Sequence, residues 1–208
     1  LRLLAELEAS GADERIATAL DRALDSQPHG EPEPVNLAAM LVHIAGAFGF
    51  HDDPRVRAKL ARIEERLAEQ TRSATKDDVA DWLVQAAMAL AALPESLRDP
   101  SALDTLARRL ASLDPPSVQR YRRYSFPTFD RPDDITLARS ALRLGIQGEW
   151  LQPWIDYIES SQDEEGRWRI GRLLPLPGAV PWPDEKEGTP SRWITAQVLY
   201  ILRAFYGE

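Results

Sequence analysis

Three aspartates in one short segment are the residues whose spacing first suggests chemistry. Asp77, Asp78 and Asp81 occupy positions i, i+1 and i+4 of a predicted helix, so Asp77 and Asp81 share one helix face. Carboxylate oxygens in this arrangement are the ligands that hard cations such as Mg²⁺ prefer. Acidic side chains at a helix start also stabilise the exposed backbone amides there. Because a lone motif is a weak signal, we expect capping and no bound cofactor, and keep these three carboxylates as candidate Mg²⁺ ligands.

His43 is the histidine that falls inside a long apolar segment, residues 35–50. In a cavity it could act as a general base or a ligand, but a histidine in such a segment is more often a core residue bonded to a neighbour. The chain has no cysteine, so it has no thiolate nucleophile or thiolate ligand. The sequence also has no Ser/His/Asp order, Gly-rich phosphate loop or paired histidines at metal spacing.

Aromatic side chains and arginines gather in one connecting segment of the second half of the chain. Tyr121, Tyr124, Phe126 and Phe129 accompany Arg123 there. At the rim of a cavity such groups can stack on an apolar or anionic ligand. Long loops also use aromatic anchors to pack down, and we favour this second interpretation. The sequence proposes the following ligand-binding residues: His43, Asp77, Asp78, Asp81, Trp82, Tyr121, Arg123, Tyr124, Phe126, Phe129, Arg192 and Trp193.

Two kinds of helical segment alternate along the chain and must position these residues. One kind has a single apolar stripe opposite a charged face, and the other is apolar on nearly every face and has to be covered on all sides. The amphipathic segments are residues 13–26, 54–70, 100–113 and 149–161, and the apolar segments are residues 1–9, 35–50, 81–93, 134–144 and 192–206. The stripe of the second amphipathic segment consists of Val56, Leu60, Ile63 and Leu67. This alternation indicates an internal helical-hairpin repeat of irregular length.

An all-α fold with two concentric layers follows from that alternation. Helices buried all round form the inner layer, and helices with one apolar stripe pack around them. The inner candidates are nearly free of charge, which favours an α/α toroid, a double-layered helical barrel, over a linear solenoid. We therefore predict a single α/α-toroid domain over residues 1–208, closed or incomplete, with about nine helices and degenerate hairpin repeats.

Composition excludes several classes of partner. The chain of 208 residues carries 25 basic against 33 acidic side chains, a net charge of −8, so we expect no nucleic acid to bind. No apolar run approaches the roughly 18 to 20 residues that span a bilayer. The absence of cysteine leaves a reducing cytoplasm as the default compartment. Oligomeric state stays open.

The segment around Gln162 resembles a known repeat motif. Tyr157, Gln162, Gly166 and Trp168 follow the spacing of the QW motif of the squalene–hopene cyclase and protein prenyltransferase superfamily. Physically, Gln162 would bond backbone groups at an outer helix end, Gly166 would permit a tight turn, and Trp168 would stack over the glutamine amide. We expect this structural clasp to tie consecutive hairpins together, with Gln162 and Trp168 on the outside of the barrel.

Degenerate copies extend the resemblance to much of the chain. Gln27 and Gln70 also end outer helices but lack the Gly-x-Trp. The segment Tyr124-Ser125-Phe126-Pro127-Thr128-Phe129 and the segment Pro190-Ser191-Arg192-Trp193-Ile194-Thr195 are similar to bacterial toroid-domain proteins of unassigned activity. The resemblance covers roughly residues 35–206 and implies the fold.

The catalytic motifs of that superfamily are missing from this chain. Its cyclases use an Asp-x-Asp-Asp acid motif, whereas the closest string here, residues 130–134, has one residue too many and lies at a predicted helix start. Its prenyltransferases bind zinc through an Asp, a Cys and a His, and this chain has no Cys. Residues 77–81 resemble the Asp-Asp-x-x-Asp motif of class I isoprenoid synthases, but no second acidic motif accompanies them.

A binding domain without catalysis is the function that these observations favour. We expect the chain to hold an apolar small molecule or a partner segment at a central cavity. An isoprenoid-active enzyme, a terpenoid cyclase or a user of prenyl diphosphates with Mg²⁺-binding carboxylates, stays open as an alternative. A structural assembly module is the third possibility, because an open toroid would expose apolar surface that another chain could cover.

Overall fold

A computed structural model describes residues 13–25, 34–69, 76–113, 125–126, 133–173 and 186–207, with the backbone alone for 76–81, 125–126 and 172–173. The all-α prediction is confirmed, because the described residues form eight α-helices and, besides two short 3₁₀ helices, only two strands of two residues each. The described part of the chain thus has eight α-helices, where about nine were predicted for the whole. The chain divides into two compact units, residues 1–110 and 111–208, and each is described by itself. Closure of a toroid and a single domain stay predictions.

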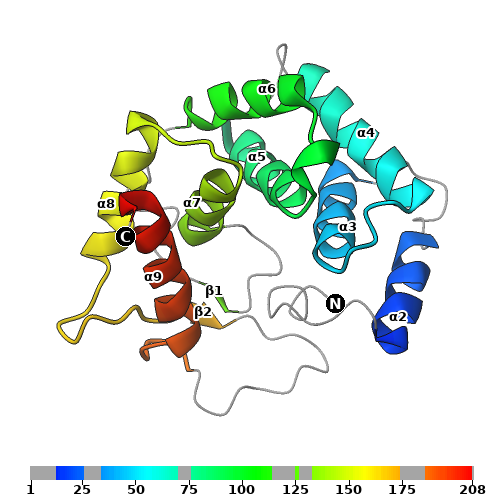
Figure 1. Ribbon diagram of the computed structural model, residues 1–208. Helices are drawn as coiled ribbons and strands as arrows, with labels where there is room; N and C mark the ends of the chain where they lie inside the picture. The colour runs from blue at the N-terminus through cyan, green and yellow to red at the C-terminus, as the bar shows by residue number, and fades with distance from the viewer. Residues whose placement is uncertain are drawn as a thin grey trace. The chain divides into compact units, whose positions relative to one another are not determined.

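The described residues of the first unit form five α-helices in two layers. Helix α3 lies against α4 and α5, and α6 lies against both α4 and α5 (Figure 1). The bounds are α2 (Glu14–Asp25), α3 (Val35–Ala47), α4 (Pro54–Glu69), α5 (Lys76–Ala91) and α6 (Pro100–Leu110), with the 3₁₀ helix η1 (Glu95–Leu97) before α6. Within this unit α3–α4 and α5–α6 are therefore consecutive helical hairpins, as the predicted repeat requires.

Burial in this unit follows the apolar pattern of each helix. Helix α3 has no charged residue and buries Ala38, Ala39, Leu41, Val42, His43, Ile44 and Ala45. Helix α2 buries only one stripe, Ile16, Leu20 and Leu24. In α4 the predicted stripe needs one correction, because Lys59 is buried and Leu60 is partly exposed. The aliphatic stem of a lysine can line such a stripe while its ammonium group reaches polar surroundings.

Helices α3 and α5 run parallel and approach closely at their C-terminal ends. Nδ1 of His43 lies 3.1 Å from the carbonyl oxygen of Met88. One turn further, a Cβ built on Gly46 would lie 2.7 Å from the carbonyl oxygen of Ala92. From the first contact to the second, the residue number increases in both helices, so the two helices run in the same direction. Glycine at position 46 is what permits this backbone separation, because any side chain there would collide with α5.

The second unit packs α7 against both α8 and α9. Its elements are β1 (Ser125–Phe126), α7 (Asp134–Arg143), the 3₁₀ helix η2 (Glu149–Leu151), α8 (Gln152–Ser160), β2 (Arg172–Leu173) and α9 (Arg192–Tyr206). The two strands pair in parallel, with Ser125 opposite Arg172 and Phe126 opposite Leu173. Asp133 caps α7 by accepting a hydrogen bond from the Thr136 amide, and Ser191 caps α9 by accepting one from the Ile194 amide.

Helix α9 differs from the sequence prediction. The segment was expected to be buried on every face, yet it buries one stripe, Ile194, Val198 and Ile201. Leu199 and Tyr200 on another face are 53% and 49% exposed. The prediction was wrong because the number of apolar residues in a helix does not show which of its faces pack against other elements. Among the described helices none is long and apolar enough to cross a membrane.

Candidate functional site

The three aspartates at positions 77, 78 and 81 lie in the first two turns of α5, which begins at Lys76. The helical backbone confirms the i, i+4 relation of Asp77 and Asp81. Their side chains lie outside the described structure, so metal binding there stays a prediction. Within the described residues no group of three or more His, Cys, Asp or Glu side chains is arranged to hold a metal ion.

The predicted aromatic and arginine rim falls mostly beyond the described ranges. Tyr121, Arg123, Tyr124 and Phe129 lie outside the described residues, and Phe126 is described only as backbone paired with β2. Arg192 and Trp193 form the first turn of α9, the former exposed and the latter partly buried. The rim therefore stays a hypothesis.

His43 has a structural role in the first unit. The side chain is buried, and its Nδ1 lies 3.1 Å from the Met88 carbonyl oxygen. Because a carbonyl oxygen only accepts, Nδ1 must carry the proton in this bond. The imidazole thereby joins α3 to α5, as expected of a core histidine.

Trp82 and Gln85 place two buried polar atoms on one side of α5. Trp82 is only 4% exposed. Its Nε1 donor and the Oε1 acceptor of Gln85 are both buried, and neither has a hydrogen-bond partner among the described residues. Helical spacing of three residues makes these side chains neighbours on the helix surface. We call Trp82 and Gln85 the α5 polar pair. Such atoms are exceptional, because a buried donor or acceptor is normally paired.

The α5 polar pair borders the seam between the two inner helices. Gln85, Met88 and Ala92 follow each other at spacings of three and four, so they share one side of α5. Met88 and Ala92 contact α3 on that side. Extended by one turn toward the N-termini, the register of these two contacts would place Ala39 and Met40 of α3 near the level of Gln85. Trp82 was predicted from the sequence as a ligand-binding residue and Gln85 was not, although a single glutamine in the apolar run 82–93 was a usable signal.

Trp168 joins two helices of the second unit and is wholly buried, while its orientation relative to a barrel stays a prediction. Its indole Nε1 donates to the Ile158 carbonyl at 2.6 Å, in the last turn of α8. Its backbone N–H donates to Thr195 Oγ1 at 3.2 Å, and its carbonyl accepts from the Ser191 amide at 2.8 Å, at the start of α9. A buried indole needs an acceptor for its N–H. The Ile158 carbonyl at the end of α8 provides one, whereas stacking over the exposed Gln162 amide would not bury the ring.

Asp163, which the sequence analysis overlooked, organises the turn that leads to Trp168. Its Oδ1 accepts from the amides of Glu165 at 3.0 Å and Arg167 at 2.9 Å. The Arg167 amide hydrogen bond, with smaller contributions from Glu165 and nearby guanidinium groups, holds the pKa of Asp163 below its usual value. Gly166 adopts φ +78°, which confirms the expected tight turn. Gln162 is exposed and Tyr157 supplies a carbonyl acceptor to two serine hydroxyls.

Two adjacent carboxyl groups are buried where α7 begins. Asp133 accepts from the Thr136 amide at 2.9 Å and from its hydroxyl at 2.7 Å, so the predicted helix-start role is right for this residue. Burial raises the pKa of Asp133, against the lowering effect of the Thr136 bonds. Asp134 has no exposed surface. The capping role of Asp133 requires no ligand.

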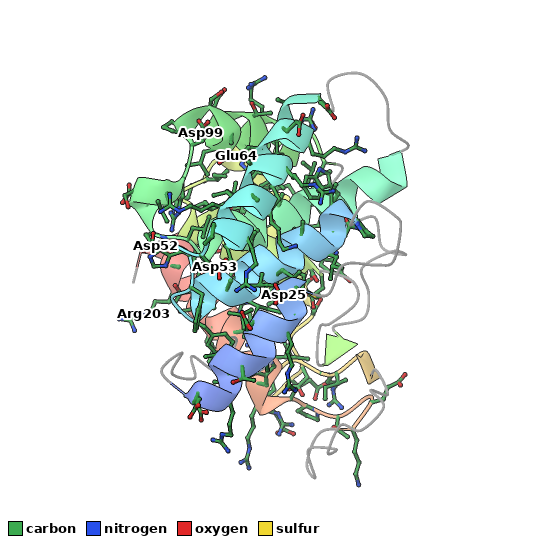
Figure 2. The ribbon with its side chains drawn as sticks, turned by 90° about the vertical axis from the view of Figure 1, so that its right-hand side faces the viewer. Asp25, Asp52, Asp53, Glu64, Asp99 and Arg203 are labelled. Atoms are coloured by element: carbon green, nitrogen blue, oxygen red, sulfur yellow. The ribbon has the colours of Figure 1, made fainter. Side chains whose placement is uncertain are left out.

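Three aspartates at α2 and at the start of α4 form ion pairs with one arginine, and Figure 2 labels two of them, Asp25 and Asp53. Arg55 of α4 donates to Asp25 and Asp21 of α2 at 2.6 and 2.7 Å, and to Asp53 Oδ2 at 2.7 Å. The Arg55 side-chain bond holds the pKa of Asp53 below its usual value. This cluster joins α2 to the start of α4. Its three aspartates all bond to Arg55, so their position needs no ligand to explain it.

Comparison of the chain with protein-family models, curated proteins and solved structures finds no match. The resemblance to the cyclase and prenyltransferase superfamily therefore stays a proposal drawn from sequence motifs. Function has to be inferred from the geometry of the described residues.

Proposed function

We propose that this chain is a non-catalytic helical-repeat domain of the toroid type that binds an apolar small molecule against its inner helix α5. The observation that carries this proposal is the Trp82 indole N–H, which is buried in an apolar helix and has no partner among the described residues. Leaving such a donor unpaired costs about 1–3 kcal/mol, so a ligand or water that accepts its hydrogen bond is favoured.

The surroundings of Trp82 suit an apolar ligand. From Trp82 to the end of α5, and along the whole of α3, the sequence has no charged residue. Ligand sites in proteins are typically apolar surfaces with a few polar groups that fix orientation. The resemblance to a superfamily of toroids that handle isoprenoids supports a molecule of that kind, and the missing acid and zinc motifs argue against turnover.

Thermal unfolding in the presence of farnesol, an uncharged isoprenoid alcohol, tests the proposal. A ligand that binds only the folded state must stabilise it, so we expect the unfolding midpoint to rise by several degrees at saturation. Trp82→Phe should reduce the rise while preserving the fold by circular dichroism. An unchanged midpoint in the wild-type protein with farnesol would remove the proposal.

Farnesyl diphosphate with and without Mg²⁺ separates this proposal from the isoprenoid-enzyme alternative. Binding through the isoprenoid chain predicts a midpoint shift that does not depend on Mg²⁺. A shift that requires Mg²⁺ and disappears in the Asp77→Asn, Asp81→Asn double variant would instead support the enzyme, because those side chains would then hold the metal.

The exposed side chains of α9 favour one further candidate, an assembly module. Leu199, Tyr200 and Tyr206 are each about half exposed on this C-terminal helix. Large exposed apolar groups often mark contact surfaces. A monomer by light scattering at micromolar concentration, unchanged in Leu199→Ser with Tyr200→Ser, would count against self-assembly.

A further inference from the structure

We propose that the polar group of the ligand is a hydroxyl, which accepts a hydrogen bond from Trp82 Nε1 and donates one to Gln85 Oε1. This inference rests on the proposed function and specifies the ligand class at the same site. Both atoms are buried without a partner among the described side chains, one a donor and the other an acceptor. One small group can satisfy both, because side chains three residues apart on a helix are neighbours, with Cβ atoms roughly 5–6 Å apart.

Only some ligand groups complement the α5 polar pair. An indole N–H donates and never accepts, while a carbonyl oxygen accepts and never donates. A hydroxyl does both and is uncharged. A carboxylate or a diphosphate only accepts, so it would leave the Gln85 oxygen unpaired and facing a negative charge. An ether likewise accepts from Trp82 but has no proton for Gln85.

The charge distribution along the inner helices supports a neutral group. Beyond Asp81, α5 has no charged residue, and α3 has none. An anion placed beside Gln85 would therefore lack a cation on either inner helix, and burial of an unpaired charge is costly.

Farnesol and its methyl ether form a matched pair that tests the inference. Both have the same isoprenoid chain and an oxygen acceptor, but only the alcohol can donate to Gln85. We expect the wild-type protein to bind the alcohol about tenfold more tightly, the cost of one unpaired buried acceptor. Affinities would be measured by isothermal titration calorimetry.

Two variants assign the preference to the α5 polar pair. Gln85→Met keeps the side-chain length and removes the acceptor, so alcohol and ether should bind equally well. Trp82→Phe removes the donor that both ligands use and should weaken both by a similar factor. Gln147→Met, an exposed glutamine on the second unit, serves as the control and should retain the tenfold preference.

Each outcome decides a separate claim. Equal binding of alcohol and ether to the wild-type protein overturns the hydroxyl assignment and leaves the proposed function standing, because a bound water could then satisfy both atoms. A tenfold preference that survives Gln85→Met also overturns it. If neither ligand binds, the proposed function itself fails.

Discussion

Buried polar groups in this protein fall into two classes, those that the fold itself satisfies and those that it leaves for another molecule. His43 and Trp168 belong to the first class, since each reaches a backbone carbonyl of a helix. Trp82 and Gln85 belong to the second. The difference is invisible in the sequence, because the same residue types occur in both classes and only the distance to an acceptor or donor separates them.

Glu64 on α4 is an example of a carboxyl group that the fold disfavours in its charged form. Burial, and secondly the negative charge of nearby Asp99, raise the pKa of Glu64 (Figure 2). Between its ordinary value of 4.5 and the raised value, the folded state binds more protons than the unfolded state, so stability falls as pH rises through that window. We expect Glu64→Gln to raise the unfolding midpoint at pH 7.

The pH dependence supplies the check on Glu64. Below pH 4.5 both folded and unfolded carboxyl groups are protonated, so the gain from Glu64→Gln should disappear there. Glu65→Gln, the exposed neighbour, should change the midpoint little at either pH. A lower midpoint for Glu64→Gln at pH 7 would show that the carboxylate stabilises the fold.

Helix packing depends on a few positions where backbones or rings meet. The parallel pair α3 and α5 approaches most closely at Gly46, and the end of α8 is joined to the start of α9 through Trp168. Gly46 is required because there is no room for a side chain, and Trp168 is required because its indole N–H reaches a carbonyl oxygen.

Gly46→Ala sets helix propensity against packing. Alanine is favoured over glycine in a helix interior by about 1 kcal/mol. The added Cβ would lie 2.7 Å from the Ala92 carbonyl oxygen, and overpacking of this kind costs about 1–3 kcal/mol. Because the contact is with backbone, which moves little, we expect a net loss of stability in urea denaturation. Asn36→Ala on the exposed side of α3 should be near neutral, and equal effects of the two changes would contradict the close approach.

Trp168→Phe removes the indole donor and retains most of the buried ring. The Ile158 carbonyl would lose the indole donor and keep the Ser161 amide, so we expect a destabilisation of about 1 kcal/mol by chemical denaturation, the net worth of one hydrogen bond. Trp150→Phe, at a partly buried tryptophan of η2, should cost clearly less. If Trp168 served only as apolar filling, the two variants would be similar.

Cooperation between the two compact units is the main question about the molecule as a whole. The sequence predicts one domain, whereas the structure divides at residue 110. One cooperative domain requires that a destabilising change in either unit be felt throughout the chain.

Amide hydrogen exchange in Gly46→Ala tests that prediction. For a single domain we expect the most protected amides of α7 and α9 to lose as much protection as those of α3 and α5, because all would exchange through the same global unfolding. Loss confined to α3 and α5 would instead establish two independently unfolding units.

Helix type and order in this protein follow from local properties of the chain. Apolar periodicity predicted the all-α class, the buried helix α3 and the stripe of α2 because burial must match hydrophobic pattern along a helix. The predicted start of α4 at Pro54 and the predicted end of α8 at residue 161 agree closely with the observed bounds. Apolar periodicity did not predict the hydrogen bonds between residues that are distant in the sequence.

Tertiary structure alone decided which polar atoms find partners and which helix faces are covered. It buried Trp168 against Ile158, exposed Leu199 on α9, gave Asp163 the role assigned to Gln162, and left Trp82 and Gln85 unpaired within the described residues. Hydrogen bonding and burial are properties of pairs of groups, and the separation of a pair in space is set by packing. The sequence shows which residues carry a donor, an acceptor or an apolar group, and the tertiary structure decides whether a partner lies within reach.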